Sequence, residues 1–191
     1  MPVGTRKRLL WSLLYRILKI QDQLATKKVL IALTILYPVF PLLLLPAVVD
    51  TDGAPILDTY FFYNADVVYR ILAEYSEAAR QSYMLGAVTV DVIYPVYYSV
   101  SLSLLLTYVI KPLSSGKDRI QYLRLLPFLP MVADFAENVL LSKVFSAWPV
   151  RLDWVADIAG YATLIKWSGL AVVFVVILLL AIINLWLSRF K

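Results

Sequence analysis

The sequence of 191 residues contains no cysteine and no histidine, and only 16% of its residues are Asp, Glu, Lys or Arg. Without cysteine, the chain forms no disulfide and offers no thiolate nucleophile. Without histidine, it cannot build a Ser-His-Asp triad, a zinc site of the usual ligand types or a His-ligated haem. The chemistry of any functional site must therefore come mainly from carboxylates, lysines, arginines and hydroxyl groups.

Apolar residues, by contrast, make up 61% of the chain, and its mean hydropathy is +0.77. Soluble domains usually have about 45–50% apolar and about 25% charged residues. Helices are the usual way for long apolar runs to cross a bilayer, because their backbone hydrogen bonds are satisfied internally. The composition therefore predicts an integral, multi-pass, all-α membrane protein.

Four apolar stretches are long enough to cross a bilayer, which requires about 20 residues of helix. The first contains three prolines, which membrane helices tolerate when neighbouring groups satisfy the freed carbonyls. We expect one transmembrane domain over 1–191, folded as a four-transmembrane-helix bundle. The predicted spans cover about 29–49, 84–110, 122–145 and 163–187.

Charged residues outside these spans alternate in sign along the chain. Segment 1–28 has seven basic residues and one acid, segment 50–83 is rich in acids, and the next loop, including Arg124, is basic again. Because loops rich in Lys and Arg stay in the cytoplasm, both termini are predicted to be cytoplasmic. The net charge of +5 thus reflects membrane topology and gives no indication of nucleic-acid binding.

Residues 6–24 form a predicted helix outside the spans. Basic side chains, among them Arg16 and Lys19, lie on one face of this helix, and Leu13 and Ile17 lie largely opposite. A basic amphipathic helix of this kind lies in the membrane interface and is attracted to anionic head groups. We expect it to anchor the chain on the cytoplasmic leaflet, with lipid sensing as the alternative.

Segment 50–83 is too long for a simple connection and is predicted to be a helical loop on the extracytoplasmic side. Asn64 is a good N-cap residue for a helix there. Arg80 is expected either to reach the lipid head groups or to point inward to acidic residues. An apolar stripe at helical spacing packs this loop onto the bundle. Its members are Val68, Ile71, Leu72, Tyr75, Ala79 and Tyr83.

Ionisable residues fall inside the predicted spans, among them Asp91, Asp134, Glu137 and Lys166. An ionised side chain at the bilayer centre costs about 2.5–3.5 kcal/mol on insertion scales. These residues must therefore face the interior of the bundle or water. The rise of a helix puts all four at a similar depth on the extracytoplasmic side, so they are able to meet.

Helix geometry supports one shared pocket. Asp134, Glu137 and Asn138 stand on one side of the third span. In the second span, Pro95 frees the carbonyl of Asp91 one turn earlier. The predicted ligand-binding residues, with Arg80 as a further candidate, are Asp91, Tyr94, Tyr98, Asp134, Glu137, Asn138 and Lys166.

The role of this pocket is left open by the sequence. Our leading interpretation is an acidic cavity that binds a lipid-like or amphiphilic ligand, or a membrane scaffold held by interhelical hydrogen bonds. The first alternative is an enzyme that uses Asp91, Asp134 and Glu137 as acid and base on a membrane lipid. The second is passage of protons or cations. Whether the protein is an enzyme stays undecided.

No cofactor is expected, and membrane lipids are the predicted partners. Carboxylate and amide oxygens in the pocket would suit Mg²⁺ or Ca²⁺, but Lys166 in the same pocket argues against a metal. A homo-oligomer or a larger membrane complex remains open, as do the identity of the ligand and of the membrane.

The chain resembles two known groups of proteins in the order of certain residues. These residues are Tyr63, Arg80, Tyr83, Asp91, Pro95, Tyr98, Asp134, Glu137, Asn138, Lys166 and Trp167. As a whole, this order resembles a group of uncharacterised four-span membrane proteins, which implies the fold and no activity. The run from Asp91 to Tyr98, an acid followed by apolar, proline and aromatic residues, resembles the EXPERA superfamily of sterol isomerases and sigma-2-like receptors. That resemblance implies a cavity for a lipid-like or cationic amphiphile. It does not imply isomerase activity, because a His takes part in the isomerases and this chain has none.

Overall fold

The computed structural model describes residues 3–114 and 119–189, with side chains from Ser12 onward. Within these ranges the chain is helical and contains no strand, which confirms the all-α class. The side chains of residues 6–11, in the predicted amphipathic helix, and residues 115–118, in the predicted basic loop, lie outside the described part.

The helical elements follow one another with short connections. The first group is α1 (Val3–Leu24), α2 (Lys27–Leu36), the π-helical turn η1 (Phe40–Leu44) and α3 (Leu45–Val48). The second is the 3-10 turn η2 (Leu57–Thr59), α4 (Ala65–Glu74) and α5 (Glu77–Val88). The third is α6 (Val90–Ile110), the 3-10 turns η3 (Lys111–Leu113) and η4 (Arg119–Leu125), α7 (Phe128–Ala147) and α8 (Asp153–Ser188).

Among the described residues, four helical stretches are long and apolar enough to cross a membrane. They are Lys27–Val48, Glu77–Leu113, Arg119–Ala147 and Asp153–Ser188. Their number and order are those predicted. The fourth is longer than the predicted span of about 163–187, because α8 already begins at Asp153.

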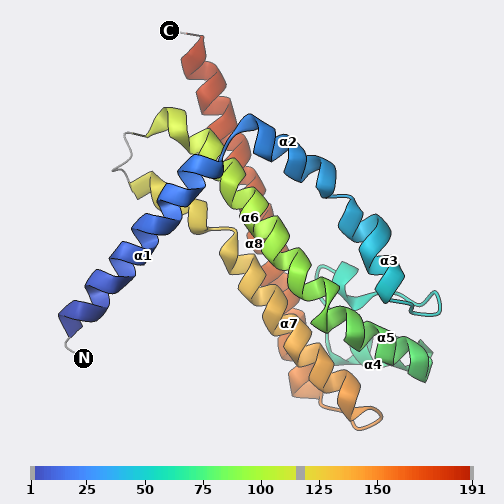
Figure 1. Ribbon diagram of the computed structural model, residues 1–191. Coiled ribbons are helices and arrows are strands. Elements are labelled where there is room, and N and C mark those ends of the chain that lie inside the picture. The colour runs from blue at the N-terminus through green and yellow to red at the C-terminus, as the bar shows by residue number, and fades with distance from the viewer. Residues whose placement is uncertain (1–2, 115–118, 190–191) are drawn as a thin grey trace.

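Helices α6, α7 and α8 pack side by side and form the centre of the molecule (Figure 1). Helices α4 and α5 cover one end of this bundle, which we call the α4 end. At the opposite end, the α1 end, the last turn of α1 joins α6. The α4 end holds a core that includes Val68, Leu72, Leu141 and Phe145, all at most 3% exposed.

The helical loop divides into two helices where one was expected. Asn64 caps α4 as predicted, with its side chain accepting a hydrogen bond from the backbone N–H of Val67. The helix then stops at Tyr75, whose backbone is extended, and Ser76 caps the new helix α5. The guanidinium of Arg80 donates to the carbonyl of Tyr75 and so provides a hydrogen-bond donor at the C-terminal end of α4.

The stretch from α2 to α3 stands apart from the bundle and has few buried residues (Figure 1). The π-helical turn η1 interrupts it within its proline-containing part. Its contacts with α6 include Phe40, whose ring packs on those of Tyr94 and Tyr97. The hydroxyl of Tyr97 also donates to the carbonyl of Leu33. Because α2 touches α6 along few residues, a space remains between α2, α6 and α8.

Candidate ligand site

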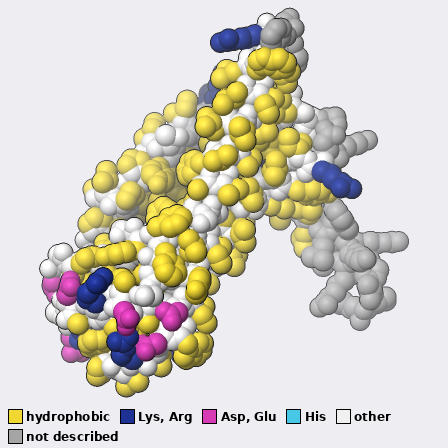
Figure 2. Space-filling model, turned by 180° about the vertical axis from the view of Figure 1, so that it is seen from behind, with side chains coloured by type: hydrophobic (Ala, Val, Ile, Leu, Met, Phe, Trp, Pro, Cys, Tyr) yellow, Lys and Arg dark blue, Asp and Glu magenta, His cyan; other side chains and the backbone are white. Residues whose placement is uncertain are grey.

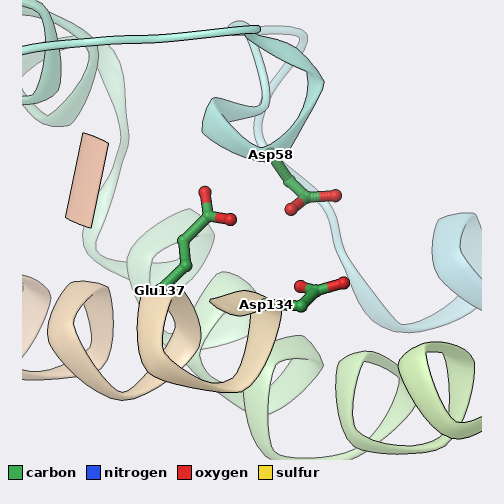
Figure 3. A group of neighbouring side chains, drawn as sticks. All are labelled: Asp58, Asp134 and Glu137. Carbon is green, nitrogen blue, oxygen red and sulfur yellow. The ribbon is translucent and has the colours of Figure 1, made fainter. Parts of the chain in front are cut away.

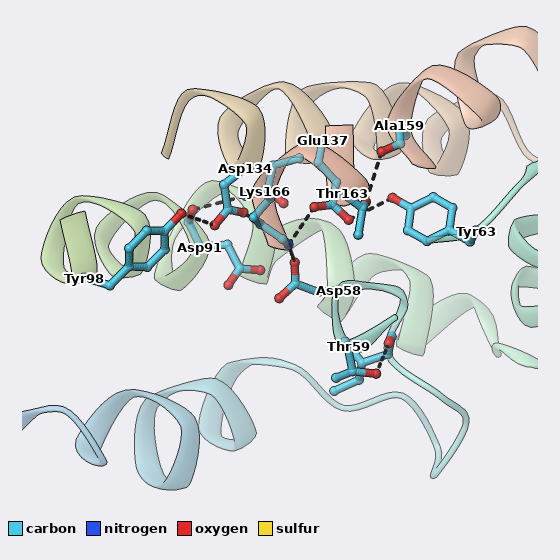
Figure 4. Close-up of polar contacts among 12 residues, drawn as sticks. Asp58, Thr59, Tyr63, Asp91, Tyr98, Asp134, Glu137, Ala159, Thr163 and Lys166 are labelled. Atoms are coloured by element: carbon cyan, nitrogen blue, oxygen red, sulfur yellow. Dashed lines mark hydrogen bonds and ion pairs between the residues drawn. The ribbon is translucent and has the colours of Figure 1, made fainter. Parts of the chain in front are cut away.

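Lys166 is the centre of a buried ionic cluster. It lies on α8 with 2% of its surface exposed. Its Nζ lies 2.7 Å from Oε2 of Glu137 and 3.7 Å from Oδ1 of Asp134, and it also contacts the carboxylate of Asp58 (Figure 4). One ammonium group is therefore shared by three carboxylates from two different segments of the chain.

Two tyrosine hydroxyls satisfy the oxygens that face away from Lys166. Tyr98, on α6, donates to Oδ2 of Asp134 over 3.0 Å. Tyr63, just before α4, donates to Oε1 of Glu137 over 2.8 Å. The cluster thus joins α6, α7 and α8 to the segment that covers the α4 end.

Tyr63 is itself almost completely buried, with 1% of its surface exposed. Burial, together with the neighbouring carboxylate of Glu137, raises the pKa of the Tyr63 hydroxyl well above its usual value. The hydroxyl therefore stays protonated and serves as a permanent donor. Tyr63 can reach this position because α8 has Gly160 there, directly against the Tyr63 carbonyl.

Asp91 and Asn138 are connected through the backbone. The side-chain amide of Asn138 donates to the carbonyl of Asp91 over 3.1 Å. This is the carbonyl that Pro95, four residues later, leaves without its helical donor, so the predicted consequence of the proline is confirmed. The carboxyl group of Asp91 lies beside the cluster near Asp58 (Figure 4).

Sequence reasoning missed Asp58 and Tyr63. Both were assigned to a loop, where acids set topology, but the 3-10 turn at Leu57–Thr59 brings Asp58 back to α8. A signal was present, since the surrounding segment 54–63 is largely apolar and Leu57 has no exposed surface. An apolar loop packs against the rest of the protein, and the polar residues within it are thereby brought close to the bundle.

The cluster forms one end of a cavity of about 660 Å³ between α2, α6 and α8. Its polar end is lined by Asp58, Asp134, Lys166, Tyr94 and Tyr98. Toward the α1 end the wall is mostly apolar. That part is lined by Leu30, Leu33, Leu102, Leu105, Leu170, Ala171 and Phe174.

Two predicted site residues lie away from the ionic cluster itself. Tyr94 lines the cavity, but its hydroxyl donates to that of Tyr37 on the opposite wall over 2.9 Å. Arg80 neither points to the acids nor extends outward. Its guanidinium is held by the carbonyl of Tyr75 and lies 5.5 Å from the ring of Trp148.

Asp58, Asp134 and Glu137 resemble a cation site in their arrangement. One oxygen of each lies within 4.8 Å of the others, and the three carboxylates point toward a common space (Figure 3). The ammonium of Lys166 contacts all three of them there. The positive charge that such a group of oxygens attracts is thus supplied by the chain itself.

Comparison with known proteins assigns no family to this chain. No protein-family model matches it, and neither does a curated protein or a solved structure. The resemblances to four-span membrane proteins and to the EXPERA superfamily therefore stay predictions.

Proposed function

We propose that this chain is a multi-pass membrane protein that binds a lipid-like or amphiphilic ligand in the cavity between α2, α6 and α8. The observation that carries the proposal is the division of the cavity wall into two parts. Leucine and aromatic side chains line its length, and Asp58, Asp134 and Lys166 line its end. An amphiphile, with an apolar chain and a polar head, has the same division.

The outer surface supports the placement in a membrane. Large apolar side chains such as Ile165, Val175 and Leu179 are more than half exposed along α8. Figure 2 shows an apolar surface along the helices and a group of charged side chains at the α4 end. Apolar areas of this extent are typical of surfaces that contact lipid. In this orientation the α1 end, with its basic residues, faces the cytoplasm and both termini lie there.

The charge of the ionic cluster limits the kind of head group that a ligand in the cavity can have. Carboxyl groups of Asp58, Asp91, Asp134 and Glu137 lie around the single ammonium of Lys166. An anionic head would be repelled by this excess of acid. We therefore expect a head group that donates hydrogen bonds to carboxylates, such as a hydroxyl or an ammonium group.

A lipid-modifying enzyme is the second candidate. The specific observation in its favour is that Asp134 both lines the cavity and contacts Lys166 and Tyr98. A carboxyl group in that position could exchange a proton with the head group of a bound lipid. Passage of protons or cations has less support, because Leu102, Leu105 and Phe174 leave the cavity wall apolar toward the α1 end.

The binding proposal is tested by the lipid that accompanies the protein. The full chain is purified in mild detergent, and the lipids extracted from it are compared by mass spectrometry with those of the source membrane. We expect one class of amphiphile to be strongly enriched. Ala171→Phe, which places a ring in the cavity, should reduce this enrichment to the background level.

Val172→Phe is the matched control, because Val172 is the neighbouring residue, 52% exposed, and does not line the cavity. It should retain the enriched lipid. Equal enrichment in the wild type and the Ala171→Phe protein would refute binding in this cavity. A chemically altered form of the enriched lipid that disappears in Asp134→Asn would favour the enzyme.

A further inference from the structure

The described part of α1, from Ser12 to Leu24, has three distinct faces, because residues three and four apart share a side of a helix. The first is at least half-buried and faces the bundle, the second is apolar and exposed, and the third is polar and exposed. The half-buried face consists of Leu14, Leu18 and Gln21. The exposed apolar face consists of Leu13, Ile17, Ile20 and Leu24. The exposed polar face, which carries the basic side chains, consists of Ser12, Arg16, Lys19 and Gln23.

The exposed apolar face is not covered by the described chain. Its four residues are between 45% and 54% exposed, and α1 projects away from the bundle (Figure 1). Arg16 and Lys19 follow the same side of the helix along one edge of this face. A helix with this division, apolar on one side and basic on the next, fits the boundary between acyl chains and anionic head groups.

The C-terminal turn of α1 is fastened to the bundle. Oδ1 of Asp22 accepts from a guanidinium nitrogen of Arg124 over 2.8 Å, and Arg124 is 2% exposed. The side-chain amide of Gln21 donates to Oγ of Ser103 over 2.7 Å. Lys111 donates to the carbonyl of Asp22 over 2.5 Å. These contacts fix the direction of α1 relative to α6.

The same contacts fix its level along the bundle. α1 ends at Leu24, and the apolar stretch that begins with α2 starts at Lys27. Lys111, which holds α1, directly follows the last residue of α6. The last turn of α1 therefore lies at the height where two of the apolar stretches end, and Lys27 and Lys28 add exposed basic charge there.

We propose that α1 docks on an anionic lipid surface. Its exposed apolar face would lie among the acyl chains, and its exposed polar face, with Arg16 and Lys19, would lie among the head groups. The inference rests on the proposed membrane placement of the four apolar stretches. It goes beyond the cavity, because it assigns a second lipid contact, of opposite charge preference, to the other end of the molecule.

The sequence has no cysteine, so a spin label attaches only at the single cysteine introduced in each variant. Full-length single-cysteine variants are placed in nanodiscs of phosphatidylcholine with or without phosphatidylglycerol. Collisions of the label with oxygen and with a water-soluble nickel complex report its depth. Ile17→Cys and Ile20→Cys probe the apolar face, Gln23→Cys probes the polar face, and Leu179→Cys on α8 probes the spans.

With phosphatidylglycerol present, labels at 17 and 20 should favour oxygen and the label at 23 should favour nickel. The contrast should weaken in phosphatidylcholine alone and in variants that also carry Arg16→Gln and Lys19→Gln. Nickel access at 17 and 20 equal to that at 23 would overturn the docking of α1. Spin–spin broadening at 20 would assign the apolar face to a second copy of the chain and would also overturn it. Nickel access at 179 would instead refute the membrane placement.

Discussion

The two ends of the molecule each bury a cation, but they surround it with different amounts of acid. At the α1 end, Arg124 pairs with one carboxylate, that of Asp22. At the α4 end, Lys166 is equally buried and is shared by Glu137, Asp134 and Asp58. The first site is a balanced ion pair, whereas the second carries more carboxylates than it can neutralise.

This difference separates a joint from a candidate ligand site. A pair whose charges cancel, such as the buried Arg124 with the partly exposed Asp22, can hold two segments together without any further group. Carboxylates without a matching cation are unfavourable wherever water is excluded. Carboxylates of this kind line the end of the apolar cavity, while the Arg124–Asp22 pair joins α1 to η4.

Removal of the Lys166 ammonium should have the largest effect on stability. Lys166→Met keeps the apolar stem and leaves the carboxylates of Asp134 and Glu137 buried without a cation. Breaking a buried ion pair by removing one partner costs about 3–5 kcal/mol. We expect the free energy of unfolding to fall by about that amount, as measured by tryptophan fluorescence during unfolding in detergent.

A second substitution distinguishes lost charge from lost packing. If unpaired acid causes the loss, Lys166→Met combined with Glu137→Gln should be more stable than Lys166→Met alone, because one buried charge has been removed. A Lys166→Met protein that unfolds like the wild type would contradict the role of the ammonium. A double variant no more stable than the single one would assign the loss to packing.

The next largest effect is expected where the covering segment meets α8. A Cβ at Gly160 would lie 1.8 Å from the carbonyl oxygen of Tyr63, so Gly160→Ala must displace the backbone of Tyr63. Overpacking of this kind costs about 1–3 kcal/mol. We expect a loss of stability in that range and a loss of the donor to Glu137.

Gly169→Ala is the control on the same helix, because the atoms nearest to its Cβ would be those of the Pro130 side chain, at 3.3 Å or more. Both substitutions favour the helix by about 0.5–1 kcal/mol through backbone entropy, so this contribution cancels in the comparison. The same unfolding assay applies. Equal stabilities of the two alanine variants would show that the contact with Tyr63 does not hold the α4 end together.

Much of the cluster could be predicted from the sequence because a charge inside an apolar stretch is conspicuous. Asp134, Glu137 and Lys166 were identified in this way, and the structure brings them together. Asp58 was not identified, because it lies in a loop and meets Lys166 only after the chain has turned back. The apolar segment 54–63 indicates that this loop packs against the protein, but the partner of Asp58 depends on the path of the whole segment.

The fold shows the same division between local and distant causes. Hydropathy located four apolar helical stretches, since each depends on its own composition. It did not locate the break at Tyr75, which depends on the Ser76 cap and on Arg80. Arg124 was assigned to a basic loop, but η4 packs on α6 and buries it, a result of tertiary contact that charge counting does not include.

The smallest effects come from one conservative substitution made at both ends. Within the described residues, Asp22→Asn removes the one carboxylate that pairs with Arg124, while Asp58→Asn removes one of several around Lys166. Asp22 is 45% exposed, so water replaces part of the lost interaction and we expect a decrease of only about 1 kcal/mol. Asp58→Asn should leave stability unchanged or slightly increased, because it lowers the excess of acid.

Measured in the same unfolding assay, the two asparagine variants decide whether charge balance is the real difference between the ends. The expected order places Asp22→Asn below the wild type and Asp58→Asn at or above it, although Asp58 contacts a cation that is as deeply buried. The reverse order would mean that Asp58 is a structural partner of Lys166 as Asp22 is of Arg124. The excess acid at the α4 end would then be neutralised within the protein, and the charge argument for a hydrogen-bond-donating head group would fail, although the apolar cavity would remain.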